Sequence, residues 1–185
     1  MQITTEAVGR HSAYQQDAVV REVEPKAVSV CLREMTGQDG LPVGGELNLA
    51  REFYHWAKEA DIDVQHILFV ACEFAQFRRC IDAGIIPGDD LKLMFVLGRY
   101  TQNMVSSVSD IQPFMEALHS DFFKPINTDW TICAFGHGET DCLLKALELG
   151  GKARIGFENN LLNRDGSVAD SNSERVEELV QLAGV

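Results

Sequence analysis

Short apolar runs alternate with longer amphipathic segments along this chain. The apolar runs are rich in β-branched and aromatic residues, which is typical of strands buried on both faces of a parallel sheet. They predict strands over Gln2–Thr5, Ala27–Leu32, Val64–Val70, Leu91–Leu97, Trp130–Phe135 and Ala153–Glu158. The amphipathic segments predict helices over Ala13–Val23, Glu46–Ala60, Glu73–Ala83, Ile111–Leu118, Glu139–Leu149 and Glu174–Leu182.

Punctuating residues support these boundaries. Ser171 and Glu174 have the spacing of a capping box, and Ser109-Asp110 is a second plausible helix start. Gly84 and Gly150 follow predicted helices, as C-terminal caps often do. The alternation of strand and helix predicts an α/β fold with a parallel sheet and right-handed crossovers. These residues alone fit a doubly wound sheet or part of a (β/α)₈ barrel, and no glycine-rich nucleotide-binding motif favours the former.

Composition and charge restrict the possible partners. The chain of 185 residues is predicted to be a single domain, 1–185. A formal net charge of −12 argues against nucleic acid, because phosphate binding needs a basic face. The five cysteines form no CxxC pair, which is typical of reduced thiols rather than a disulfide framework. No signal peptide or membrane span is recognisable, so we expect a cytoplasmic protein that does not dock on membranes.

The last predicted strand carries the candidate chemistry. If Ala153–Glu158 is extended, then Arg154, Gly156 and Glu158 share one face, because strand side chains alternate. A guanidinium and a carboxylate would then flank a residue without a side chain, which leaves room for a ligand. Ligands of parallel α/β proteins bind at such carboxyl ends of strands. The alternative is a buried Arg–Glu pair that only braces the strand end.

Three blocks of sequence together resemble the β-keto acid cleavage enzyme family. They are GGKARIGFENNLLNRDGSVADSN near the C-terminus, LMFVLGRYTQN with TDWTICAFGHGE in the middle, and QITTEAVGRHS followed by EPKAVSVCLREM at the start. The resemblance implies a zinc-dependent (β/α)₈ TIM barrel, of which this chain would supply strands 3 to 8, an incomplete barrel. It implies a transferase that combines a β-keto acid with acetyl-CoA and releases acetoacetate and a new acyl-CoA, in a Claisen-type exchange. It also implies a homo-oligomer.

The same resemblance assigns roles to individual residues. Glu158 takes the place of a zinc ligand, and Arg154 that of the arginine that orients the base and faces developing negative charge. Thr4, with Thr5 beside it, matches the hydroxyl residue that holds substrate. Asn159 stands where well-described members carry a general-base aspartate. An amide accepts no proton at neutral pH, so Asn159 can only hydrogen-bond the substrate.

Two departures from the family pattern qualify these roles. One is Asn159 in place of the general-base aspartate, for which Glu6, His137 and Glu139 are candidate replacements. The other concerns the first strands of the barrel. The chain begins at what resembles the third strand, so the first two βα units are expected to be absent, together with the His-x-His that would supply two zinc ligands. The five histidines are His11, His55, His66, His119 and His137, of which His137 is best placed to face the site. Glu158 alone cannot hold zinc tightly, because such sites need about three protein ligands.

Missing strands would also leave unpaired sheet edges, so we expect the isolated chain to be marginally stable, to aggregate or to pair with a partner.

Three functions remain open at this point. The chain is an incomplete member of this enzyme family, a non-catalytic remnant that acts as an interaction subunit, or a generic α/β domain whose Arg–Glu pair is structural. The loop Thr36–Gly45 is a candidate lining of the pocket.

Overall fold

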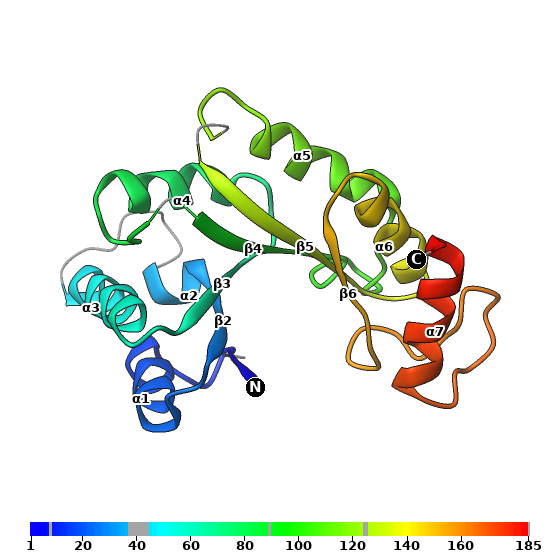
Figure 1. Cartoon of the computed structure of the whole chain (residues 1–185), viewed down its shortest axis with the longest axis horizontal. Helices are drawn as coiled ribbons and strands as arrows, with labels where there is room; N and C mark the ends of the chain where they lie inside the picture. The colour runs from blue at the N-terminus through cyan, green and yellow to red at the C-terminus, as the bar shows by residue number, and fades with distance from the viewer. Residues whose placement is uncertain (8, 37–44, 89, 124–125, 185) are drawn as a thin grey trace. The chain divides into compact units, whose positions relative to one another are not determined.

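The computed structural model describes residues 1–7, 9–36, 45–88, 90–123 and 126–184. These residues form a six-stranded sheet in the order β1-β2-β3-β4-β5-β6 (Figure 1). The strands are β1 (Gln2–Thr5), β2 (Ala27–Cys31), β3 (Asp63–Leu68), β4 (Asp90–Leu97), β5 (Asn127–Ala134) and β6 (Lys152–Arg154). The helices are α1 (Ala13–Val23), α2 (Leu32–Thr36), α3 (Gly45–Glu59), α4 (Glu73–Asp82), the 3-10 helix η1 (Val108–Ile111), α5 (Gln112–Leu118), α6 (Glu139–Glu148) and α7 (Asn172–Ala183).

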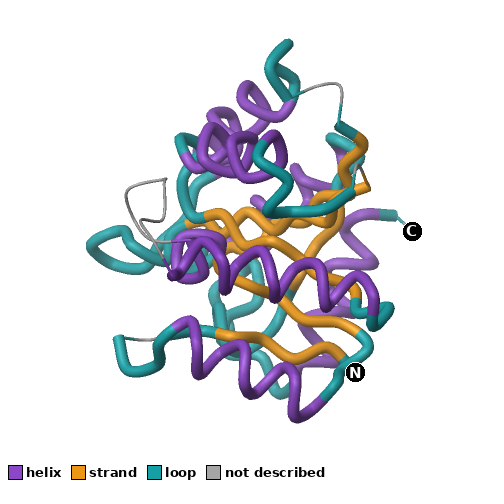
Figure 2. Tube along the Cα trace, turned by 90° about the vertical axis from the view of Figure 1, so that its left-hand side faces the viewer, coloured by secondary structure: helices purple, strands orange, loops and turns teal. Residues whose placement is uncertain are grey.

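Strand order decides between the two architectures that the residues left open. The strands follow one another in the sheet in chain order, whereas a doubly wound sheet reverses its order at a switch point. The described pairings β1–β2, β2–β3 and β5–β6 are all parallel (strands in orange in Figure 2). The predicted α/β class, with βα units of an incomplete TIM barrel, is therefore confirmed.

The chain divides into two compact units, which are described separately. Unit 1 comprises Met1–Leu68, Cys72–Leu93 and Asp121–Thr128, and unit 2 comprises Phe69–Ala71, Met94–Ser120 and Asp129–Val185. An aromatic cluster lies in the core of unit 1. The ring of Phe123 lies 4.8 Å from that of Phe74 and 5.9 Å from that of Phe77. Phe77 and Phe123 are completely buried, so these rings anchor α4 within the unit.

Unit 2 is organised around the second half of β4. Phe95 stacks on Phe114 of α5 at 4.9 Å and on Trp130 of β5 at 5.9 Å between ring centroids. Gly151, which precedes β6, lies against the same indole: a Cβ there would come within 2.3 Å of Trp130. Only glycine fits at this position, so the start of β6 is fixed by close packing against β5.

Most predicted element positions agree with the structure. Helix α1 has the predicted bounds, and Gly84 and Gly150 adopt φ of 64° and 83° after their helices. The predicted helix start at Ser109-Asp110 is wrong, because Ser107 caps η1 and its backbone N–H donates to Asp110 Oδ2 at 2.8 Å. The short helix α2 was not predicted. Residues 37–44 of the candidate loop Thr36–Gly45 lie outside the described residues.

Candidate active site

The strand that carries the candidate chemistry is shorter than predicted. β6 ends at Arg154, so the extended conformation expected through Glu158 is wrong. The chain turns instead at Gly156, whose carbonyl accepts hydrogen bonds from the backbone N–H groups of Asn159 at 2.9 Å and Asn160 at 3.3 Å. Arg154 and Glu158 therefore do not share a strand face. The turn folds the glutamate back toward the strand end.

Arg154 and Glu158 nevertheless contact each other directly. The Nη2 group of Arg154 forms an ion pair with Glu158 Oε2, and Arg154 Nη1 lies 3.7 Å from Met94 Sδ on β4. The side chains are 37% and 59% exposed, respectively. The pair is thus open to solvent at the carboxyl end of β6, and the alternative of a buried structural pair does not hold for these two residues.

The room expected beside Gly156 is occupied. A Cβ on Gly156 would lie 3.3 Å from the Oδ1 atom of Asn172, the first residue of α7. The same Oδ1 accepts a hydrogen bond from the backbone N–H of Phe157 at 2.8 Å. The missing side chain of Gly156 therefore admits the start of α7 rather than a ligand, and Asn172 is a site-shaping residue that the sequence analysis missed.

Asn159 faces the protein interior. It is 8% exposed, and its Nδ2 group donates to Cys133 Sγ at 2.8 Å. Its backbone carbonyl accepts from the N–H of Gly136 at 3.0 Å, which ties the turn to the segment after β5. Cys133 is also paired with Arg154 in the strand register. Burial raises the pKa of Cys133 to about 11, so this thiol is protonated and unreactive at neutral pH.

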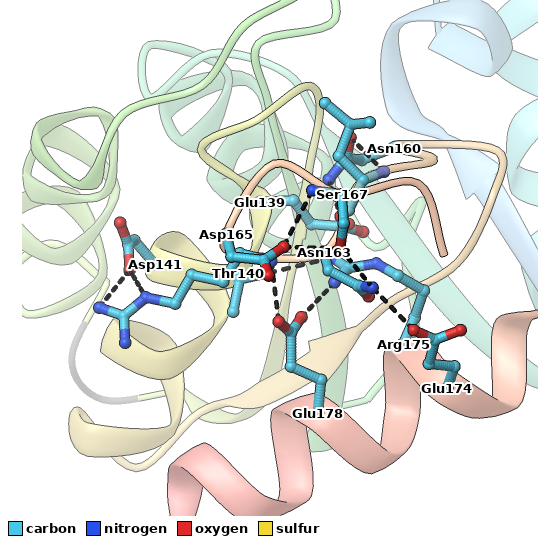
Figure 3. Close-up of polar contacts among 12 residues, drawn as sticks. Glu139, Thr140, Asp141, Asn160, Asn163, Asp165, Ser167, Glu174, Arg175 and Glu178 are labelled. Atoms are coloured by element: carbon cyan, nitrogen blue, oxygen red, sulfur yellow. Dashed lines mark hydrogen bonds and ion pairs between the residues drawn. The ribbon is translucent and has the colours of Figure 1, made fainter. Parts of the chain in front are cut away.

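A second Arg–Glu pair lies buried next to this turn. Glu139 begins α6, and its Oε2 atom accepts a hydrogen bond from Arg175 Nη2 of α7 at 2.9 Å (Figure 3). Both side chains are fully buried. Arg175 Nη2 also lies 3.0 Å from the hydroxyl oxygen of Thr140, and its Nη1 group pairs with Glu178. Glu139 Oε1 accepts from the N–H of Gly156 at 3.4 Å, so the cluster supports the turn directly.

Burial raises the pKa of Glu139 above its ordinary value, although the charge and hydrogen bonds of Arg175 act in the opposite direction. The carboxylate of Glu139 is held between Arg175 and Gly156, so in this structure it braces the turn. Sequence analysis also missed Arg175. Its signal was an arginine four residues before Leu179, on the buried side of α7.

Further side chains hold the loop between β6 and α7 in place (Figure 3). Asn163 donates to Glu174 Oε1 at 2.7 Å, and Arg164 Nε donates to Asp141 Oδ1 at 2.9 Å. Ser171 caps α7 as predicted, because its Oγ accepts from the N–H of Glu174 at 3.1 Å. The reciprocal bond of a capping box is not formed, because Glu174 Oε2 accepts from the N–H of Asp170 instead, at 2.6 Å. Helices α6 and α7 thereby hold the polar loop that follows the Arg154–Glu158 pair.

The remaining predicted site residues lie elsewhere. Thr4 and Thr5 end β1 in unit 1, where Thr4 is exposed and Thr5 is buried with its hydroxyl 3.5 Å from the Ser29 carbonyl. Glu6 follows in the same unit. His137 is exposed in the turn between β5 and α6 of unit 2. The structure thus brings together Arg154, Glu158 and Asn159.

The metal-ligating side chains of the described residues do not converge on one point. Within them, no three His, Cys, Asp or Glu side chains gather closely enough to hold a metal ion. His66 is buried between the rings of Tyr54 and Phe77, at 5.3 Å and 4.7 Å. In the part of the chain that the structure describes, every helix is too short or too polar to cross a membrane.

Comparison with known proteins assigns the family. The sequence profile of the beta-keto acid cleavage enzymes matches residues 1–185. The chain belongs to this family. The resemblance noted from the three sequence blocks is confirmed.

Two curated relatives of this family member are named 3-keto-5-aminohexanoate cleavage enzyme. The one from Fusobacterium nucleatum is 34% identical over 89 residues, which are 48% of this chain and 29% of that protein. The one from Acetoanaerobium sticklandii is 37% identical over 59 residues, which are 32% of this chain and 22% of that protein. The matched segments therefore cover less than a third of either relative.

Proposed function

We propose that this chain is part of an enzyme that exchanges acyl groups between a β-keto acid and acetyl-CoA. The acyl group of the keto acid would pass to coenzyme A, and the acetyl group would take its place on the CH₂–COO⁻ fragment, which gives acetoacetate and a new acyl-CoA. All atoms balance without an added oxidant or reductant. Family membership supports the class of substrate, and the name of the two relatives suggests 3-keto-5-aminohexanoate as the first substrate to test.

The observation that carries this proposal is the half-exposed guanidinium of Arg154. Glu158 fixes its Nη2 side, whereas Nη1 points to the sulfur of Met94 at 3.7 Å. A thioether is a weak acceptor, so a substrate carboxylate or an enolate oxygen would be a much stronger partner. An oriented guanidinium can bind such an oxygen and stabilise the negative charge that develops when the carbanion forms.

Other residues would have supporting roles. The Thr4 hydroxyl, at the end of β1, is proposed as a substrate contact, and Thr5 would hold that strand end through the Ser29 carbonyl. Asn159 would position the turn, since its amide is bonded to Cys133. Of the candidate bases in unit 2, His137 is favoured over Glu139, because His137 is exposed and Glu139 is held by Arg175.

Zinc remains part of the proposal for the whole protein only. The residues present do not by themselves fit a zinc site, because Glu158 is a single carboxylate whose Oε2 atom is paired with Arg154. If the complete enzyme holds zinc, Glu158 would contribute one ligand. The other ligands would come from residues outside this chain, which in a homo-oligomer include those of a second copy.

The test is acetoacetate formation by the purified protein from acetyl-CoA and a series of β-keto acids, with zinc supplied. We expect Arg154→Ala to lower kcat/KM by about 100-fold or more, as removal of one charge-stabilising donor does. The matched control is Lys152→Ala, which removes an exposed cation paired with Asp129 at the other end of β6 and should leave activity unchanged. If the unaltered chain forms no acetoacetate from any of the keto acids, catalysis by this chain is refuted, and a role as an interaction subunit takes its place.

A further inference from the structure

A cavity of about 340 Å³ lies in unit 1, at the amino-terminal ends of β3 and β4. Asp63 and Val64 from the start of β3 line it, as do Leu91 and Lys92 from the start of β4. The rest of the wall comes from His66 and Asp90 of the same two strands, from α3 and the turn that follows it, and from the segment before β4. Substrates of parallel α/β enzymes bind at the carboxyl ends of the strands, so the cavity is not part of the candidate active site.

Two buried polar atoms on the cavity-lining side chains lack a partner. Tyr54 and His66 both line the cavity, and each is only 2% exposed. Within the described residues, neither the hydroxyl of Tyr54 nor Nδ1 of His66 has a hydrogen-bond partner. The two rings lie 5.3 Å apart. Buried polar atoms are nearly always hydrogen-bonded, so unpartnered atoms on two adjacent cavity-lining side chains indicate that a polar partner belongs beside them.

The wall favours a neutral ligand. Burial lowers the pKa of His66 to about 3 and raises that of Tyr54, so both groups are uncharged at physiological pH. Five charged side chains line the cavity, Lys58, Asp61, Asp63, Asp90 and Lys92. Of these, Lys92 Nζ lies 2.6 Å from Asp63 Oδ1, and Asp90 accepts a hydrogen bond from Asn127 at 2.9 Å. An ion would have to compete with these internal pairs.

Apolar side chains supply the remaining surface. Ile62, Ile86 and Pro87 line the cavity together with Val64 and Leu91. A hydroxyl or carboxamide can donate and accept at once, which suits a phenol beside a neutral imidazole. The combination of apolar wall and two uncharged polar atoms matches a compact apolar body with one such group.

We propose that this cavity binds a small neutral molecule that carries a hydroxyl or carboxamide group on an apolar body, with the polar group hydrogen-bonded to Tyr54 and His66. Phenol is a suitable probe because it presents one hydroxyl on an apolar ring.

The test is an NMR titration of the full chain with phenol, followed through the backbone amides of Ile62, Val64 and Leu91. Toluene, which lacks the hydroxyl, and benzoate, which is charged, are the comparison probes. Tyr54→Phe removes one polar partner without changing the ring. Tyr14→Phe is the matched control, because Tyr14 lies on α1 in the same unit and is 57% exposed.

We expect saturable shifts with phenol, binding about tenfold weaker in Tyr54→Phe, and unchanged binding in Tyr14→Phe. Toluene and benzoate should bind more weakly than phenol. Thermal unfolding of Tyr54→Phe without ligand should show no loss of stability, since the hydroxyl has no hydrogen-bond partner to lose among the described residues. The proposal is overturned if phenol gives no saturable shift, if Tyr54→Phe binds it equally well, or if toluene binds as tightly. In those cases the two polar atoms are satisfied by ordered water.

Discussion

Two of the Arg–Glu pairs in unit 2 have the same chemistry and opposite surroundings. Glu139 and Arg175 are fully buried, whereas the side chains of Arg154 and Glu158 are 37% and 59% exposed. The buried pair joins α6 to α7 and reaches the turn at Gly156. The exposed pair lies at the end of β6, where a ligand can approach. Burial, not residue type, separates a structural pair from one that can take part in chemistry.

The energetic consequences differ in the same way. A buried ion pair has lost its hydration, so each partner becomes a liability once the other is removed. An exposed pair exchanges freely with water, so breaking it costs little. Arg154 can therefore leave Glu158 for a substrate oxygen at low cost, whereas Arg175 cannot leave Glu139. Four predictions test this comparison.

The largest effect is expected from Arg175→Met. It leaves the carboxylate of Glu139 buried and unpaired, which should lower the free energy of unfolding by about 3–5 kcal/mol. Urea denaturation followed by circular dichroism measures the change. Arg164→Met, which breaks the half-exposed pair with Asp141 in the same unit, is the control and should change stability by less than about 1 kcal/mol. Similar losses in both variants would contradict the comparison.

A second change should rescue the first. Adding Glu139→Gln to Arg175→Met removes the stranded charge, so we expect the double variant to regain about 1–3 kcal/mol over Arg175→Met alone. The double-mutant cycle gives the coupling free energy between the two residues. A coupling near zero would show that the loss in Arg175→Met comes from the contacts with Thr140 and Glu178 instead.

The pH dependence of stability should separate Glu139 from an exposed glutamate. Because burial raises the pKa of Glu139 above its ordinary 4.5, its contribution to stability is complete below that value and is lost as the pH rises through the raised pKa. Relative to Glu139→Gln, the unaltered protein should therefore lose stability as the pH increases from 4.5.

Glu174 should show the opposite sign. Hydrogen bonds from the N–H of Asp170 and from Asn163 lower its pKa below 4.5. Its contribution is therefore present above 4.5 and is lost as the pH falls through the lowered pKa. Thermal unfolding of Glu139→Gln and Glu174→Gln across this range measures both, and parallel pH profiles would refute the assignment.

The smallest effect on stability is expected from Arg154→Met. Breaking the exposed pair with Glu158 should lower the free energy of unfolding by at most about 1 kcal/mol. Any loss of acetoacetate formation in this variant then reflects lost chemistry and not lost folding. A loss of stability as large as that of Arg175→Met would remove the distinction between the pairs.

Much of the fold was predictable because it depends on local pattern. The apolar runs located the six described strands within a few residues, except for the end of β6, and the spacing of Ser171 and Glu174 correctly located the start of α7. The end of β6 was not predictable. Alternation around Arg154 suits a strand, but the N–H of Phe157 is captured by Asn172, fifteen positions further along the chain. A local pattern contains no information about that contact.

The sequence by itself determined the order of βα units, the family, and the presence of Arg154, Glu158 and Asn159 at one strand end. The tertiary structure decided which Arg–Glu pair is buried. Glu139 and Arg175 are 36 positions apart and meet because α6 and α7 pack together. The cost of desolvating a charge depends on everything packed around it, and that quantity is set only when the chain is folded.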